Sequence, residues 1–320
     1  MKSLIRKLFS NARGQSIFVM VVALPAMVGS LALVMDVGNL YYNKLWMQTA
    51  MDSGVLAGAL YLPSDPSQAE SVAQQYAILN GLKQSEITSV SVTPDDKAVT
   101  MTSTRSLPCY FCAVLGEGTA FAQTTASSGT ASSGGLHSSA TALIEPIRSA
   151  TGVVPIGLDS RTSYTYGSEV QLKTGQLGPG NWGPLALGAN GASTYQDNVQ
   201  NGYPGRLSIG DWPETETGNI VGPTQTAIQD RISLGENQYS TGTFEHHNLG
   251  DPRVMLIPIV DYADANGKTP VEVVGFAVVW VASVDSQGDI TCYFIQQSMP
   301  NAQPDPNAAS GGATAPTLIN

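Results

Sequence analysis

A run of 19 uncharged, mostly apolar residues at positions 17–35 constrains this chain more than any other feature: IFVMVVALPAMVGSLALVM. About 20 apolar residues, rising ~1.5 Å each in a helix, cross the ~30 Å hydrocarbon core of a bilayer. Four basic residues and no acidic residue precede the run, and Asp36 follows it. Because basic flanks stay in the cytoplasm, we expect residues 1–16 inside and residues 36–320 outside the membrane.

A cleaved secretory signal begins in the same way, but its apolar core is usually ~7–15 residues long and a small-x-small cleavage site follows closely. The clearest such site, Ala57-Gly58-Ala59, lies more than twenty residues beyond the run. We therefore interpret residues 17–35 as a retained transmembrane helix, with a cleaved signal or a buried core helix as alternatives. Pro25 is compatible with a membrane helix, where neighbouring groups re-satisfy the freed carbonyl.

The charge of the remaining chain excludes some partners. Residues 36–320 carry 11 basic and 25 acidic residues, a net charge of −14. Such a balance argues against nucleic acid as a partner and against docking of the outer region on anionic lipid. The length of 320 residues is enough for one large or two modest domains with their own cores.

The helix is expected to continue beyond the membrane, because no proline occurs between Asp36 and Leu62. Ala50, Gly54 and Gly58 recur every four residues and form one narrow face of this helix. A seam of small residues lets another helix approach closely. The seam packs either on the protein's own next domain or on a partner helix, and the sequence leaves both alternatives open.

A small sheet follows the long helix. The segment Pro63-Ser64-Asp65-Pro66 ends that helix, and Ser67 with Glu70 three residues later predicts a capping box for a second helix at about 68–80. We expect these elements to form a pilin-like α+β module over residues 36–126. Its other elements are strands at about 87–93 and 98–104, a helical turn from Pro108, and a third strand at about 119–125.

The chain then changes composition. Residues 127–142 are rich in Ser and Gly and predict a flexible linker. Residues 143–299 predict a mostly-β extracytoplasmic domain that ends in a meander, with strands at 254–260, 271–282 and 290–296 and one helix at about 224–234. Asn266-Gly267 is a hairpin turn signal, and 271–284 is apolar enough for a central strand buried on both faces. Residues 300–320 are rich in Pro, Ala and Gly and predict a disordered tail. The fold class is therefore α+β.

The N-terminal stretch resembles the TadE/TadG-like components of Flp (Tad) pilus assembly. The matching motifs are Arg13–Ser16, Leu24-Pro25, the Asp-x-Gly-x-Leu-Tyr step at 36–41 and the small-residue run Leu56–Ala59. The stretch at 111–116 (FCAVLG) and the strand expected after it extend the resemblance to residues 13–126. Residues 143–299 also look like the extracytoplasmic region that some of these proteins carry.

The resemblance implies a non-catalytic, single-pass protein of the bacterial cytoplasmic membrane that helps assemble or anchor a thin pilus. Its implied partners are the Tad pilus machinery, other TadE/TadG-like membrane proteins and the lipid bilayer. One feature departs from prepilin-like members, which are cut after a glycine and carry Glu at the fifth mature position. If Gly14 were that glycine, the fifth residue would be Val19, and residues 15–35 contain no acid. The chain is therefore closer to the uncut TadG type.

Candidate chemistry is sparse, and we predict no catalytic, cofactor or metal site. Cys109 and Cys112 have the spacing of a redox motif, but apolar flanks and the lack of a preceding βαβ pattern favour a local disulfide or two buried thiols. The His246-His247 pair and the Glu214/Glu216 pair are expected in solvated loops. The stretch 264–267 does not have the register of a calcium loop.

Three functional hypotheses follow. The first is a membrane-anchored assembly component of a Tad pilus or a related secretion apparatus. The second is a membrane-tethered envelope enzyme whose site is built from scattered loop residues. The third is a surface adhesion or ligand-binding module that uses the outer β domain.

Overall fold

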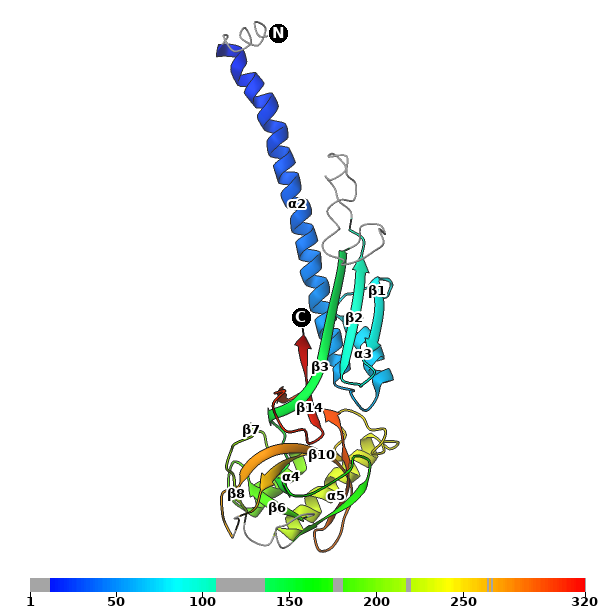
Figure 1. The fold of residues 1–320 in the computed structure, drawn as a ribbon, viewed down its shortest axis with the longest axis vertical. Coiled ribbons are helices and arrows are strands. Elements are labelled where there is room, and N and C mark those ends of the chain that lie inside the picture. The colour runs from blue at the N-terminus through cyan, green and yellow to red at the C-terminus, as the bar shows by residue number, and fades with distance from the viewer. Residues whose placement is uncertain are drawn as a thin grey trace.

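A computed structural model describes residues 12–107, 136–174, 181–216, 220–263, 265 and 267–319. A long helix leads down to a small helix-covered sheet, and a second, larger β region lies beyond it (Figure 1). The helices are α2 (Ala12–Ala59), α3 (Pro66–Leu79), α4 (Ala192–Asn201) and α5 (Val221–Gln238). The expected α+β class is confirmed.

Two sheets contain the described strands. The first has the order β1-β2-β3-β14-β12, and β7 and β13 pair with the far end of β3. Its strands are β1 (Ile87–Val92), β2 (Ala98–Arg105), β3 (Leu136–Ala150), β7 (Leu207–Ser208), β12 (Gln297–Ser298), β13 (Ala302–Pro304) and β14 (Ala313–Ile319). The second has the order β4-β9-β10-β11-β5-β6-β8, and an additional pairing joins its first strand, β4, to β6. Its strands are β4 (Ile156–Asp159), β5 (Glu169–Thr174), β6 (Asn181–Ala186), β8 (Glu214–Thr215), β9 (Val254–Asp261), β10 (Glu272–Val284) and β11 (Ile290–Ile295).

Strand β10 is the central strand that its apolar sequence predicts. It pairs with β9 on one side and β11 on the other. Successive strand residues point to opposite faces of a sheet. Accordingly Ala277, Val279 and Val281 enter one core, which also holds residues of α4 and α5, whereas the alternate set at 276, 278 and 280 enters a second core. A strand with two buried faces has no polar side, which is why residues 271–282 show no alternation.

The expected flexible linker is wrong for its last part. Residues 136–142 belong to β3, which pairs with β2 along its first half and with β13 and β7 at its other end. Ala140 and Ala142 are buried against the helices of the first module, so small side chains here reflect close packing rather than flexibility. One strand therefore passes from the first module into the second without a break (Figure 1).

The expected disordered tail is also wrong. β14 pairs antiparallel with β3 from Thr314 opposite Pro146 to Ile319 opposite Thr141. Ala313 and Ala315 are buried in the second core. Gly311 approaches the carbonyl oxygen of Phe276 too closely for any side chain. The Ala/Gly-rich composition of the tail is thus a requirement of tight backbone packing, which composition alone does not distinguish from disorder.

Helix α3 begins earlier than its sequence pattern predicts. Its N-cap is Asp65, whose carboxylate accepts a hydrogen bond of 2.9 Å from the N–H of Gln68. Pro66 at the first helical position has the fixed φ that suits this place, so the cap precedes Ser67. Glu70 does not complete a capping box, because its Oε1 accepts from the N–H of Val92 on β1 at 3.1 Å. The helical turn from Pro108, the strand at 119–125, Cys109 and Cys112 lie outside the described residues.

Candidate functional site

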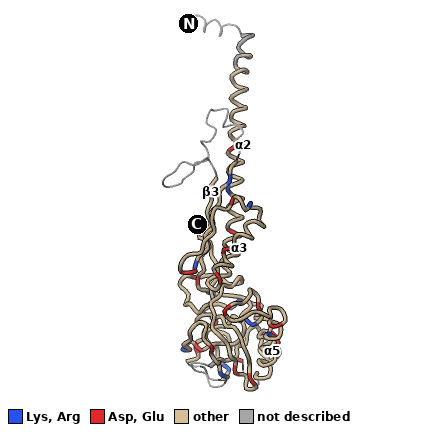
Figure 2. Tube along the Cα trace, turned by 90° about the vertical axis from the view of Figure 1, so that its right-hand side faces the viewer, with Lys and Arg blue, Asp and Glu red and all other residues tan. Residues whose placement is uncertain are grey.

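The first half of α2 is an apolar helix that touches almost nothing else in the described structure. Nearly every large apolar side chain from Ile17 to Leu45 is exposed, for example Val34 at 67% and Met35 at 69%. A helix that is apolar all round is stable only when it is buried or in lipid. Among the described residues this is the one helix long and apolar enough to cross a membrane. Figure 2 shows this half as almost continuous tan, with charges gathering below it.

Two tyrosines mark the outer end of the apolar stretch. Tyr41 and Tyr42 are 69% and 68% exposed. They lie on the order of 10 Å beyond residue 35, at ~1.5 Å rise per residue. Tyrosine is enriched where a membrane helix enters the headgroup layer, because its ring is apolar and its hydroxyl is polar. The exposed half of α2 therefore has both the length and the boundary residues of a membrane anchor.

The second half of α2 is packed, and α3 of the same chain occupies the small-residue seam. Ala50 is buried, and Gly54 and Gly58 face three alanines of α3: Ala69, Ala73 and Ala77. A Cβ on Gly54 would lie 2.5 Å from the carbonyl oxygen of Ala73, and one on Gly58 2.5 Å from that of Ala69. Of the two alternatives that the sequence leaves open, the structure shows the intramolecular one. A partner helix at this face would have to displace α3.

A polar cluster fixes α2 at the point where it leaves the folded module. The guanidinium of Arg105 donates to both carboxylate oxygens of Glu86 at 2.7 and 2.8 Å and to Asn43 Oδ1 on α2 at 3.0 Å. It also stacks over the ring of Trp46, 4.4 Å from the centroid. These contacts hold the pKa of Glu86 below its ordinary value, chiefly through the hydrogen bond from Arg105. Gly81, at φ +99°, has Trp46 in the space that a Cβ would need.

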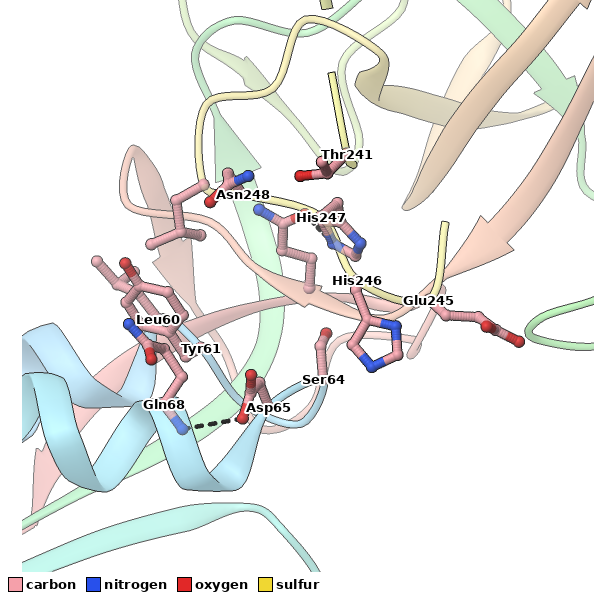
Figure 3. A pocket seen from close by; sticks show the side chains of 12 residues that line it. Leu60, Tyr61, Ser64, Asp65, Gln68, Thr241, Glu245, His246, His247 and Asn248 are labelled. Carbon is pink, nitrogen blue, oxygen red and sulfur yellow. Dashed lines mark hydrogen bonds between the residues drawn. The ribbon is translucent and has the colours of Figure 1, made fainter. Parts of the chain in front are cut away.

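A polar cleft lies between the two modules. Its volume is about 340 Å³, and the α2–α3 turn lines one side while the loop at 241–249 lines the other (Figure 3). Beside it Ser64 donates to the carbonyl oxygen of Gln296 at 2.7 Å, which ties the turn to the outer domain. His247 is half-buried, with Nδ1 3.1 Å from the carbonyl oxygen of Phe244 and Nε2 3.0 Å from Gln297 Oε1. Burial lowers the pKa of His247, although both hydrogen bonds oppose the shift.

A comparison with family models finds a match in the helix just described. Residues 14–60 match the family model described as "Putative Flp pilus-assembly TadE/G-like". This segment is TadE/G-like. The match covers the Leu-Pro span, the Asp36–Tyr41 step and the seam, so the resemblance is confirmed over residues 14–60. Comparisons with curated proteins and with solved structures give no match.

Outside the TadE/G-like segment, the residues singled out from sequence do not come together. Lys268 pairs with Glu214 at 3.0 Å, and Glu216 accepts from the N–H of Gly191, so the two carboxylates have separate structural contacts. Within the described ranges, no three His, Cys, Asp or Glu side chains form a group that would hold a metal ion. Cys292 is a buried free thiol in the outer core, where burial raises its pKa to about 12.

Sequence reasoning missed the cluster around Arg105 and the cleft. Arg105 follows a predicted strand and Trp46 lies on a predicted helix, but 59 positions separate them. No local sequence pattern predicts that these two side chains are in contact. The buried Asp251–Arg253 pair in the outer domain (2.8 Å), which stacks over Trp280, is also recognisable only from the fold.

Proposed function

We propose that this protein is a membrane-anchored structural component in the assembly of a Flp (Tad) pilus or a related secretion apparatus. The observation that carries the proposal is the position of the family match, which coincides with a helix that is exposed and apolar in its first half and packed in its second. The match points to a structural pilus component rather than to an enzyme.

The two halves of α2 and the outer domain have different roles in this proposal. The exposed half of α2 anchors the chain in the cytoplasmic membrane, with the basic N-terminus inside and residues 36–320 outside. The packed half, fixed by the seam with α3 and by Arg105, continues the anchor as a rigid stem. The two modules share β3 and β14, so the outer domain is held at a defined distance from the membrane, where it meets other Tad components.

Deletion of the gene in the bacterium that carries it tests the proposal. We expect cells without the protein to lose surface pili, counted by electron microscopy, and a plasmid copy to restore them. Normal pili in the deletion strain would contradict an assembly role. Protease digestion of intact spheroplasts tests the orientation separately: residues 36–320 should be cleaved from outside, and protection of that region would show that the chain is inserted the other way.

A further inference from the structure

We propose that the outer edge of β1 binds an extended segment of a different polypeptide by strand addition, in the groove between β1 and α3. The inference deepens the proposed function and rests on it for the orientation of the molecule. β1 is the end strand of its sheet in the described part of the chain, so one of its edges faces away from β2. An end strand presents backbone N–H and C=O groups that the ladder does not use.

The register of the β1–β2 hairpin shows which backbone groups face outward. The N–H of Thr93 donates to the carbonyl of Ala98, so Thr93 points toward β2. In an antiparallel ladder, hydrogen-bonded and non-hydrogen-bonded residues alternate. Ser91, opposite Thr100, therefore also points inward, whereas Val90 and Val92 direct their N–H and C=O groups outward.

A side chain of α3 already occupies one of these outward donors. Glu70 Oε1 accepts from the N–H of Val92 at 3.1 Å. The carboxylate stands where the carbonyl oxygen of an added strand would otherwise lie. This contact shows independently that the edge is accessible to an acceptor, and it fixes where an incoming strand must end. The groups of Val90, one step along, have no such cap from α3.

The groove lies beside the uncapped part of the edge. Its volume is about 420 Å³, and its walls are the polar face of α3 and the first four residues of β1. The lining residues are Ser67, Glu70, Ser71, Gln74 and 87–90. Glu70 is the one ionisable residue among them. The groove therefore suits an extended segment with small, uncharged or β-branched side chains, held mainly through its backbone.

The occupant is a different polypeptide rather than a second copy of this chain. β1 runs along the same long axis as α2 (Figure 1). Copies anchored in one membrane share that axis, so their β1 strands run in the same direction. In a parallel ladder, a residue whose backbone groups point toward the neighbouring strand lies opposite a residue whose groups point away from it. A two-fold axis would instead place each residue opposite its own copy, so two identical β1 edges cannot pair in this way. A segment from another protein is free to run antiparallel.

The full chain in lipid nanodiscs, with a blocked peptide Thr-Val-Thr-Val-Thr-Lys as the probe, tests the proposal. Hydrogen–deuterium exchange of the segment 87–93 is followed by mass spectrometry. We expect exchange of the Val90 amide, resolved by fragmentation of this segment, to slow about fivefold at saturation, the equilibrium factor of one net hydrogen bond. The same peptide with alternate N-methylated residues lacks the donors and should protect nothing. Slow exchange of the Val90 amide before any peptide is added would show that the edge is already paired and would overturn the proposal.

Two matched pairs of variants locate the interaction. Val90→Pro removes the outward donor without touching the β1–β2 ladder and should weaken peptide binding about fivefold, whereas Val90→Ala keeps the donor and should bind as before. Glu70→Ala frees the N–H of Val92 and should strengthen peptide binding by a similar factor. Glu70→Gln keeps an acceptor oxygen for this N–H and should leave peptide binding unchanged. If Val90→Pro unfolds the module, the Glu70 pair still decides: equal affinities for both Glu70 variants would overturn the proposal.

Pilus counts separate this inference from the proposed function. If deletion removes pili while the exchange experiment shows no protection, the groove proposal fails and the assembly role stands. If deletion leaves pili intact, the assembly role fails, and the exchange experiment still decides whether the edge binds a strand. Restoration of pili by Val90→Ala but not by an equally stable Val90→Pro supports both.

Discussion

Gly54 and Gly58 leave no room for a side chain, because a Cβ at either position would lie 2.5 Å from a backbone oxygen of α3. Backbone cannot move aside as a flexible side chain does. We expect Gly54→Leu or Gly58→Leu to force α3 away from α2 and to cost at least about 1–3 kcal/mol, the usual range for overpacking. Thermal unfolding of the full chain in detergent, followed by circular dichroism, measures the loss.

Gly38 provides the matched control, because it lies in the same helix and a Cβ added there would have no atom within 4 Å. Gly38→Leu should leave the unfolding midpoint unchanged or slightly higher, since leucine favours helix over glycine. Equal midpoints for Gly58→Leu and Gly38→Leu would contradict the tight α2–α3 contact.

Arg105 joins the stem of the helix to the sheet. Its partner Glu86 is 12% exposed, so Arg105→Ala leaves a mostly buried carboxylate without its cation. We expect a loss of about 2 kcal/mol, since hydrogen bonds to charged groups contribute ~1.5–3 kcal/mol. The control is Lys97→Ala, which removes an ion pair whose side chains are 62% and 61% exposed and should change nothing measurable. Chemical denaturation compares the two, and equal losses would be inconsistent with a structural role for Arg105.

Glu86 and His247 each make the free energy of unfolding depend on pH, in two separate pH ranges. The lowered pKa of Glu86 stabilises the fold above its ordinary value of 4.5, and this contribution is lost as the pH falls below it. Burial lowers the pKa of His247 from 6.5, so the unfolded chain takes up its proton first and stability falls as the pH drops through 6.5. Between pH 7.5 and 5.5, where Glu86 stays ionised, His247→Gln should flatten the fall in unfolding free energy. An unchanged slope would mean that His247 is not buried in solution.

At the scale of elements, β14 locks the two modules together. It pairs with β3 across the point where β3 passes from one module to the other. Ending the chain after Gly312 removes this strand and exposes the edge of β3. We expect the truncated chain to be cleaved by trypsin or thermolysin within residues 136–150, where the full chain resists. Removal of Asn320 alone keeps β14 whole and should change nothing; equal cleavage of both forms would contradict the lock.

Elements with strong apolar patterns were predictable from sequence, and elements built from small residues were not. The runs that form β9, β10 and β11 have few polar residues and clear turn signals between them. The segments that form β14 and the start of β3 consist largely of Ser, Ala and Thr, and a close backbone approach selects the same small residues as a flexible linker does. In β3 the buried residues Leu136, Ala140 and Ala142 are spaced by even numbers, a weak signal of a strand.

Helix α4 also escaped prediction. It is short and polar, and its buried apolar contacts are Tyr195 and Val199, one helical turn apart. The seam on α2 was predictable as a face, because small residues every four positions lie on one side of a helix. The helix that packs against this seam was not predictable, because the alanine face of α3 and a helix of a partner protein both require small residues on α2.

At the scale of the whole molecule, the structure is a rod-like stem with a domain at its end (Figure 2). The exposed half of α2 is long and apolar enough to cross a membrane, and its packed half, α3, β3 and β14 form a continuous connection to the outer domain. Such a connection holds the outer domain at a fixed distance from the exposed half of α2. We therefore infer that the protein works as a permanent tether.

Release of the outer region from its anchor is the decisive test of the tether. In the deletion strain, residues 36–320 are exported behind a cleavable signal peptide, and their folding is checked by protease resistance. The full chain should restore surface pili, whereas the released, folded form should not restore them at equal abundance. Normal pili with the released form would contradict the tether.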